Sequence, residues 1–536
     1  MAIKHKLAPA VAVSALALVG LSAAETASAA DCSLGQQRIQ GRGASFQNTA
    51  HNGTAGGWII NAGCVVDGGG LISFGAADKD PQEAAASPAN TGFNAGNDLV
   101  FYDSQGSGNG LAAFGAGTGS APKFSNVPGQ RDNQVSFIGT DDPATPAQSL
   151  TMEEGGNVVA GADNAINDDD DGVFHTIPVA QSSVAVIVKT PLGCKLPAGL
   201  VYNKRMLLAA GPAGKANSTV EQLFSGEITT WGQLGWKNTT DGLPCSQPLR
   251  RVVRRDNSGT TFGFKTFLAS TDQGLGGATN WAAHDETGEN NTIWPGKTVA
   301  DAYVDNEGAC DGVDSSVPGG GPAAEGDFVC QNASSNGNGG LADTLNATTS
   351  AGGIGFADLA TARSKNFGWL NTSDRTYWLP LRAANSPSTV IDAAEAAQGF
   401  KQGGAKGANC QLAEYGINGV GGVLPTNTKG DWSAVYQDQT PTQTQYPLCL
   451  LTYSGAWEDY NDVYPNTTLS CTDKAARQTA VKNYLQYVLG TTAGGDEGQT
   501  LLSSNDYAAI PASISLKSAT YFTQAAFKKA PNVNVC

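Results

Sequence analysis

The sequence predicts an α/β fold with largely parallel sheets, divided into more than one domain. Three observations lead to this class. Strand-like and helix-like segments alternate between residues 177 and 268, as in parallel α/β sheets. The length of 536 residues suits two to four domains, and the 40% apolar content can form a sizeable core. The 68 glycines and 24 prolines indicate many turns but are too few for a collagen-like or low-complexity chain.

Each predicted element follows from its own pattern. Residues 177–188 form a long, β-branched run bounded by turns, which is typical of a buried strand. A helix capped by Ser218 or Thr219 follows, with apolar residues on one face. Residues 249–254 are predicted as a strand and residues 261–268 as a helix.

Near the C-terminus, Thr472 is expected to cap a further helix that Gly490 ends. Its apolar face consists of Val481, Tyr484, Leu485 and Val488. Glycine-rich residues 52–75 and 86–98 are predicted as long loops or hairpins, and residues 305–340 as a loop held by a disulfide.

The N-terminus has the pattern of a secretory signal peptide. A basic stretch, residues 4–6, precedes an apolar run over residues 7–21 and small residues up to Ala30. We therefore expect cleavage near Ala30, export to the cell envelope or the medium, and no membrane span. Asp31 precedes Cys32 where a lipoprotein signal needs a small residue, so no lipid anchor is expected.

Ten cysteines are scattered along the chain without a Cys-x-x-Cys pair, which favours disulfides over zinc or redox chemistry. Pairing of neighbours along the chain is one hypothesis. It joins Cys194 to Cys245 and Cys310 to Cys330.

The charge balance limits the partners. The formal net charge is -16, which argues against generic binding to nucleic acid or to an anionic membrane surface. An anionic ligand would have to be held by local hydrogen-bond geometry rather than by a basic surface.

Three segments nevertheless share a design suited to an anion: residues 41–46, 102–111 and 253–262. Each combines glycines and hydroxyl side chains with an expected helix N-terminus, where unpaired N–H groups and the helix dipole favour negative charge. Taken singly, residues 106–108 also fit a tight turn, and Ser45 fits an ordinary helix cap. The third segment is the most specific, because an arginine, an aspartate, two hydroxyls and a glycine fall within seven residues.

Other kinds of site find little support. Residues 296–298 imitate the end of a P-loop, but Asn291 stands where its first glycine belongs. The acidic run 168–171 lacks the spacing of a calcium loop and is predicted as a surface turn. After signal removal only His51, His175 and His284 remain for Ser-His-Asp catalysis. We expect no metal, no cofactor and no enzymatic activity.

The order of the segments resembles that of a known family. The matching residues are 43–46, 106–108, 137–143, 177–181, 223–231, 252–260, 352–357 and 446–448. From about residue 40 to 515 the chain resembles the substrate-binding proteins of phosphate ABC transporters (the PstS family of the type II periplasmic-binding-protein superfamily).

The resemblance implies a binding site for inorganic phosphate. Ser45 and Phe46 match a hydroxyl and a backbone N–H donor, and Ser107 matches a second hydroxyl donor. Asp141 matches the carboxylate that accepts the proton of hydrogen phosphate. The remaining matches are Arg254 for the single arginine, Asp256 for the acid that holds it, and Ser258, Gly259 and Thr260 for the loop around the anion.

The chemistry agrees, because a fixed carboxylate repels a fully deprotonated anion and accepts a hydrogen bond from a protonated one. Asp141 would therefore favour phosphate over sulfate. One departure from the family is Gln47, which replaces the proline usual after the phenylalanine of the first motif. The chain is also longer than a plain family member, with the excess at residues 47–100 and 285–340.

The resemblance further implies a two-lobed α/β fold with loop insertions, a two-strand hinge and a ligand closed between the lobes. We expect residues 31–185 and 361–536 in lobe 1 and residues 186–360 in lobe 2. The expected function is phosphate binding for uptake, by a monomer that delivers its ligand to an ABC permease. Two alternatives are a secreted phosphatase-like relative and a surface or matrix protein that uses the lobes as a scaffold.

Overall fold

The computed structural model describes most of the chain between residues 38 and 524. The described residues are 38–53, 57–61, 65–66, 99–116, 131–132, 135–154, 172–196, 219–225, 228–271, 294–297, 303–306, 328–332, 337–348, 352–369, 375–382, 390–394, 407–418, 422–438, 445–463, 471–490 and 497–524. The predicted signal peptide, the acidic run 168–171, His284, and much of the three glycine-rich stretches lie outside them.

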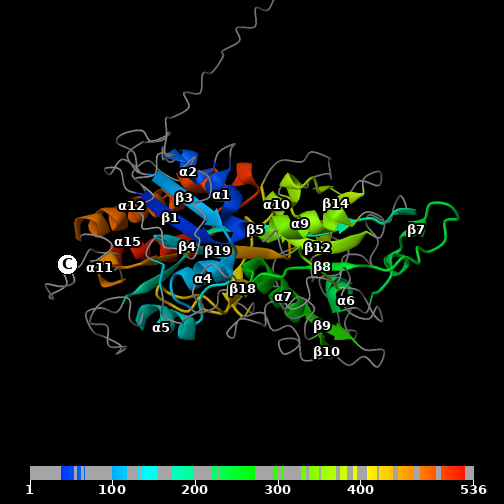
Figure 1. Ribbon diagram of the computed structural model, residues 1–536, viewed down its shortest axis with the longest axis horizontal. Helices are drawn as coiled ribbons and strands as arrows, with labels where there is room; N and C mark the ends of the chain where they lie inside the picture. Colours follow the sequence, from blue (N-terminus) through cyan, green and yellow to red (C-terminus); the bar gives the residue numbers. More distant parts are fainter. Residues whose placement is uncertain are drawn as a thin grey trace, which may run out of the picture.

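Among the described residues, eleven strands form one mixed sheet (Figure 1). Nine follow one another in the order β11 (Phe328–Cys330), β8 (Arg251–Val253), β12 (Gly353–Asp358), β5 (Phe174–Lys189), β19 (Cys449–Trp457), β4 (Phe137–Thr140), β1 (Arg38–Gly43), β3 (Leu99–Ser104) and β2 (Val65–Val66). The other two, β14 (Thr376–Leu379) and β13 (Gly368–Trp369), branch from β5. The α/β class is confirmed.

Strand β5 divides this sheet into two regions. Its residues up to Ser183 pair with β19, and those from Val184 pair with β12 and, over residues 186–189, with β14. We call β19, β4, β1, β3 and β2 the first region and β12, β8, β11, β14 and β13 the second region. Within each region the outer strands are parallel, whereas β5 and β19 pair antiparallel with their neighbours. The expected parallel pairing is therefore found only away from the centre of the sheet.

The long central strand follows from its sequence. The β5 side chains are buried along nearly the whole strand, as expected for a β-branched run covered on both faces. Helices lie on both sides of each region (Figure 1). In the first region, α1 (Asn48–Asn52) and α12 (Cys471–Leu489) lie on one side, and α4 (Ser107–Ala113) and α5 (Pro146–Glu154) on the other.

The predicted helices are confirmed, with small changes at their ends. Helix α6 (Thr219–Ser225) buries Val220, Leu223 and Phe224, and α7 (Gly259–Thr271) is longer than its pattern indicated. Helix α12 begins one residue before Thr472, and Gly490 follows its end with a φ of 67°. The predicted strand 249–254 is shortened to β8.

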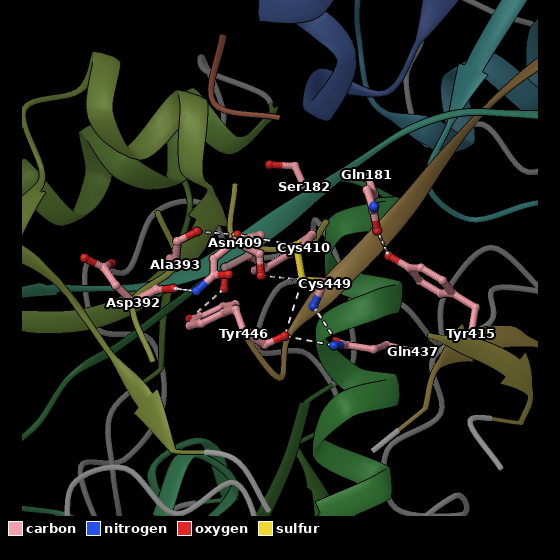
Figure 2. The surroundings of a disulfide bond; sticks show 12 residues. Gln181, Ser182, Asp392, Ala393, Asn409, Cys410, Tyr415, Gln437, Tyr446 and Cys449 are labelled. Carbon is pink, nitrogen blue, oxygen red and sulfur yellow. Dashed lines mark hydrogen bonds between the residues drawn. A yellow bond between two sulfur atoms is a disulfide. The ribbon is translucent and has the colours of Figure 1, made fainter. Parts of the chain in front are cut away.

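Two disulfides fasten described residues. Cys194 pairs with Cys245, as predicted, and Cys410 pairs with Cys449 at the start of β19. Figure 2 shows the second bridge beside Gln437, whose side chain accepts from the Cys449 N–H at 2.6 Å and donates to the Tyr446 carbonyl at 2.8 Å. Cys330 is also disulfide-bonded, but Cys310 lies outside the described residues, so that pairing stays a prediction. No helix in the described part of the chain is long and apolar enough to span a membrane.

Candidate anion-binding site

The predicted site residues meet where the two regions join. Ser45 follows β1 in the 3-10 helix η1 (Ser45–Gln47), Ser107 opens α4 after β3, and Asp141 follows β4. From the second region, Arg254 follows β8 and Gly259 opens α7. All five positions follow the carboxyl ends of strands, which is where open α/β sheets bind ligands.

Contacts between the regions show how closely these segments approach. The Thr260 hydroxyl lies 3.4 Å from Asp141 Oδ2, although the residues are 119 positions apart. A Cβ built on Gly259 would lie 2.4 Å from Ser107 Oγ and 2.6 Å from the Asp142 nitrogen. Only glycine allows this approach of α7 to the first region.

Arg254 is fully buried and held by two partners. Its Nε and Nη2 donate to the two carboxylate oxygens of Asp256, the first at 2.6 Å, and its Nη1 donates to Asn338 Oδ1 at 2.6 Å. A guanidinium carries five N–H donors, so these bonds leave two of them for a further acceptor. Asp256 therefore holds the arginine, as predicted, and the free end of the fork can bind an anion.

Asn338 joins the parts of the site and was missed by the sequence analysis. It lies in the first turn of α9 (Gly337–Ala347), where its backbone N–H donates to Ser45 Oγ at 3.2 Å. Its Nδ2 donates to Thr260 Oγ1 at 3.1 Å and to Asp358 Oδ1 at 2.6 Å. Arg254 can only donate and Asp358 accepts, so the orientation of the amide is fixed. The glycine-rich run Gly337-Asn-Gly-Gly340 was the available signal, although it lacks the hydroxyl side chains of the other three segments.

Several hydroxyl side chains are arranged as donors. Ser45 Oγ accepts from the Asn338 N–H, Ser107 Oγ accepts from the Asp141 N–H at 3.1 Å, and Thr260 Oγ1 accepts from the Asn338 amide. Because each oxygen already receives a hydrogen bond, its own hydrogen is left to point toward another acceptor. Ser258 also accepts, at 3.2 Å from the Thr261 N–H at the start of α7.

Asp141 is the carboxylate of the site, and it is nearly fully buried. Thr452 of β19 donates to its Oδ1 at 2.6 Å. Burial raises the pKa of Asp141 to about 7, while the hydrogen bond from Thr452 acts in the opposite direction. Burial also raises the pKa of Asp358 to about 6. Asp358 comes directly after residues 352–357, one of the segments that carry the family resemblance. Nothing in the sequence around Thr452 indicated the role of Thr452.

Phe46 contributes differently from the other predicted residues. Its side chain is buried, with its ring edge-on to Tyr507 at 6.1 Å between centroids, and its carbonyl accepts from the Tyr507 hydroxyl. A role for its backbone N–H stays a prediction. The described residues hold no group of three or more His, Cys, Asp or Glu side chains suited to a metal ion.

A family model described as a PBP superfamily domain matches residues 75–490. The chain belongs to the PBP superfamily. The match covers most of the chain and includes Ser107, Asp141, Arg254 and Asn338, while Ser45 lies before it. The expected superfamily is thereby confirmed. No curated protein sequence matches the chain.

Solved structures similar to this chain include two phosphate-binding proteins and a DING protein. A high-affinity periplasmic phosphate-binding protein, PfluDING, bound with phosphate, is 17% identical with a TM-score of 0.45, covering 93% of this chain and 96% of its own. The phosphate-binding protein from Stenotrophomonas maltophilia is 15% identical with a TM-score of 0.47, at 91% and 94% coverage. A DING protein is 16% identical with a TM-score of 0.47, at 93% and 98% coverage.

Proposed function

We propose that this PBP superfamily chain binds inorganic phosphate between its two regions and serves phosphate uptake. The proposal rests on one observation, which is the arrangement of several hydrogen-bond donors around a single acceptor, the Asp141 carboxylate. The hydroxyls of Ser45 and Ser107 are left to donate, beside two free N–H donors of Arg254, while the Thr260 hydroxyl donates to Asp141. An oxyanion with several acceptor oxygens matches this set.

Asp141 supports phosphate rather than sulfate as the anion. A buried carboxylate oxygen facing the ligand needs a hydrogen-bond donor, and hydrogen phosphate carries one. Sulfate carries no proton at neutral pH, so it would place two negative oxygens in contact. Sites built for a specific hydrogen bond reject ligands that lack it strongly, because buried polar groups are left unpaired.

The helix ends add to the attraction without adding formal charge. Helices α7 and α9, of 13 and 11 residues, both begin at the site, and their first N–H groups carry partial positive charge. This helps a chain of net charge -16 to hold an anion. The bound charge is then neutralised locally.

The biological role that we propose follows from the expected export. Residues 1–30 would be removed, lobe 1 would contain residues 31–185 and 361–536, and lobe 2 residues 186–360. The disulfides fit an oxidising compartment. The protein would act by binding and release, handing phosphate to a permease without covalent chemistry.

Calorimetric titration of the chain without residues 1–30 tests the proposal. We expect one phosphate per chain and sulfate binding weaker by roughly 100-fold or more at pH 8. Arsenate, which has the same charge and proton as phosphate, serves as the positive control for site shape. Absence of phosphate binding by the folded protein would overturn the proposal.

A further inference from the structure

Behind Asp141, a chain of hydrogen bonds runs away from the site into the core. Thr452 Oγ1 donates to Asp141 Oδ1 at 2.6 Å, and Gln47 Nε2 lies 2.7 Å from Thr452 Oγ1. Gln47 Oε1 lies 3.0 Å from His51 Nε2, and His51 Nδ1 lies 2.7 Å from the Tyr484 hydroxyl. We call Thr452, Gln47, His51 and Tyr484 the relay. All four side chains are fully buried, and Tyr484 lies in α12.

The direction of each hydrogen bond in the relay is determined by one carbonyl. Gln47 Nε2 also lies 2.7 Å from the Tyr453 carbonyl oxygen, which can only accept. The amide nitrogen of Gln47 therefore faces β19 and donates to both Tyr453 O and Thr452 Oγ1. Thr452 receives this bond, so its own hydrogen is directed to Asp141 Oδ1.

The other end of the amide fixes the tautomer of His51. Gln47 Oε1 must accept, so His51 carries its hydrogen on Nε2 and leaves Nδ1 to accept from the Tyr484 hydroxyl. Gln47 and His51 are four residues apart on η1 and α1, which places them on one helical face.

The surroundings of His51 keep it neutral. Its ring stacks on Tyr102 at 4.1 Å between centroids and contacts Trp58 at 5.0 Å and Phe137 at 5.7 Å. Burial among these rings lowers the pKa of His51 to about 3. A second proton on the ring would need an acceptor at Nδ1, where the Tyr484 hydroxyl donates. The relay thus keeps one direction across the physiological range.

We propose that Gln47 and His51 are positioning residues that hold Thr452 as a donor to one oxygen of Asp141 and thereby set the pH above which the site rejects sulfate. This rests on the proposed phosphate-binding function. The residue type at position 47 matters, because only a side chain with both a donor and an acceptor can join Thr452 to His51.

The link to selectivity follows from the charge of Asp141. A hydrogen bond from Thr452 stabilises the ionised carboxylate, which accepts from hydrogen phosphate but repels sulfate. Protonated Asp141 is a donor and tolerates sulfate. Without Gln47, Thr452 Oγ1 no longer receives a hydrogen bond, so its hydroxyl is less polarised and the bond that it donates to the ionised carboxylate weakens. The pH of sulfate rejection would then rise.

Other groups also face Asp141 and must stay unchanged in the test. They are Arg254, Asp358, Tyr102, Tyr453 and Tyr507. Burial raises the pKa of each of these tyrosines well above its ordinary value, and that of Asp358 to about 6. Two of these groups also touch the relay: Tyr102 stacks on His51, and the Tyr453 carbonyl accepts from Gln47.

The test measures sulfate and phosphate affinity by calorimetry from pH 5 to pH 9 in Gln47→Leu and His51→Phe. We expect the pH at which sulfate affinity begins to fall to rise by roughly one unit in both, so that sulfate binds about tenfold more tightly at pH 8. Phosphate binding should persist, because the proton shared between phosphate and Asp141 can belong to either of them. His175→Phe is the matched control, since His175 is equally buried but bonds to Thr428 and Glu458 instead.

Each outcome is decisive. If the unmodified protein does not bind phosphate, the proposed function fails. If it binds phosphate and rejects sulfate, but either folded variant keeps the unmodified sulfate profile, the inference on the relay is overturned. Thr452→Ser, which keeps the hydroxyl, should retain the original profile, and Thr452→Val should lose it. A nitrogen NMR spectrum of the unmodified protein must show His51 protonated on Nε2 and not on Nδ1 at pH 7, whatever the stability of the variants.

Discussion

The two charged ends of the site are both buried but are held in different ways. Arg254 is gripped by an opposite charge, Asp256, and by the amide of Asn338. Asp141 is held by neutral hydroxyls, of which Thr452 is the closest at 2.6 Å. Burial without a neighbouring counter-ion at hydrogen-bond distance raises the pKa of Asp141 to about 7. In the proposed phosphate site, the arginine end would therefore provide affinity and the aspartate end would provide selectivity.

The largest effect should come from removing the arginine end. In Arg254→Ala, the anion loses two charge-assisted donors, and Asp256 becomes an unpaired buried carboxylate. Phosphate affinity should fall by roughly 100-fold or more, as is typical when one member of a buried charged pair is truncated. Titration calorimetry measures it. Arg375→Ala is the control, because Arg375 is half-buried and donates to the Thr190 carbonyl instead. Equal losses in both variants would contradict the assignment.

Changing the aspartate end should alter the choice of anion. In Asp141→Asn, the side chain gains an N–H donor and loses its charge, so sulfate affinity should rise while phosphate affinity falls. The phosphate-to-sulfate ratio should drop by roughly 100-fold at pH 8. Competition between the two anions measures it directly. Asp392→Asn removes another buried aspartate, which accepts from Trp378 Nε1 at 2.7 Å, and it should leave the ratio unchanged.

A smaller effect is expected where the two ends approach each other. The added methyl group of Gly259→Ala would lie 2.4 Å from Ser107 Oγ and must push α7 away from the first region. Overpacking of this size costs about 1–3 kcal/mol, which corresponds to roughly 5- to 150-fold in phosphate affinity if the cost falls on the ligand-bound state. In Gly339→Ala the new methyl group meets Lys365 at 3.5 Å, an ordinary contact, so binding should be preserved. If Gly259→Ala binds phosphate as tightly as the unmodified protein, the close approach of α7 to the first region is wrong.

The smallest effect concerns the stability of the ligand-free protein. The folded state holds a proton on Asp141 up to about pH 7 and on Asp358 up to about pH 6, whereas the unfolded chain releases both near pH 4. The folded state therefore binds more protons between these values, and stability falls as pH rises from about 4 to 7. We expect the melting temperature to drop by a few degrees over this range and to drop less in Asp141→Asn. Scanning calorimetry without phosphate provides the measurement.

The sequence predicted those parts of the site that are written in short segments. Arg254, Asp256, Ser258, Gly259 and Thr260 lie within seven residues, so local composition indicated their shared purpose. The strand β5 was predicted because burial on both faces requires a continuous β-branched run.

Residues that act across long separations could not be predicted in this way. Thr452 and Asp141 are 311 positions apart, and only the register of β19 against β4 brings them together. Asn338 looked like part of a glycine-rich loop, although its place at the start of α9 joins both regions. The antiparallel insertion of β19 into the centre of the sheet was likewise missed, because strand order is not encoded in the pattern of any single strand.

The position of β19 also affects the order in which the sheet can form. This strand lies between β4 and β5, but it is made about 310 residues after β4 ends. Until β19 is in place, β4 and β5 each have a hydrogen-bonding edge without its partner strand. The carboxylate of Asp141 also lacks its closest hydrogen-bond donor until then, because that donor, Thr452, belongs to β19. The aspartate end of the proposed phosphate site would thus be completed only when β19 joins the sheet, and a chain cut short before residue 449 would lack the strand that connects β4 to β5.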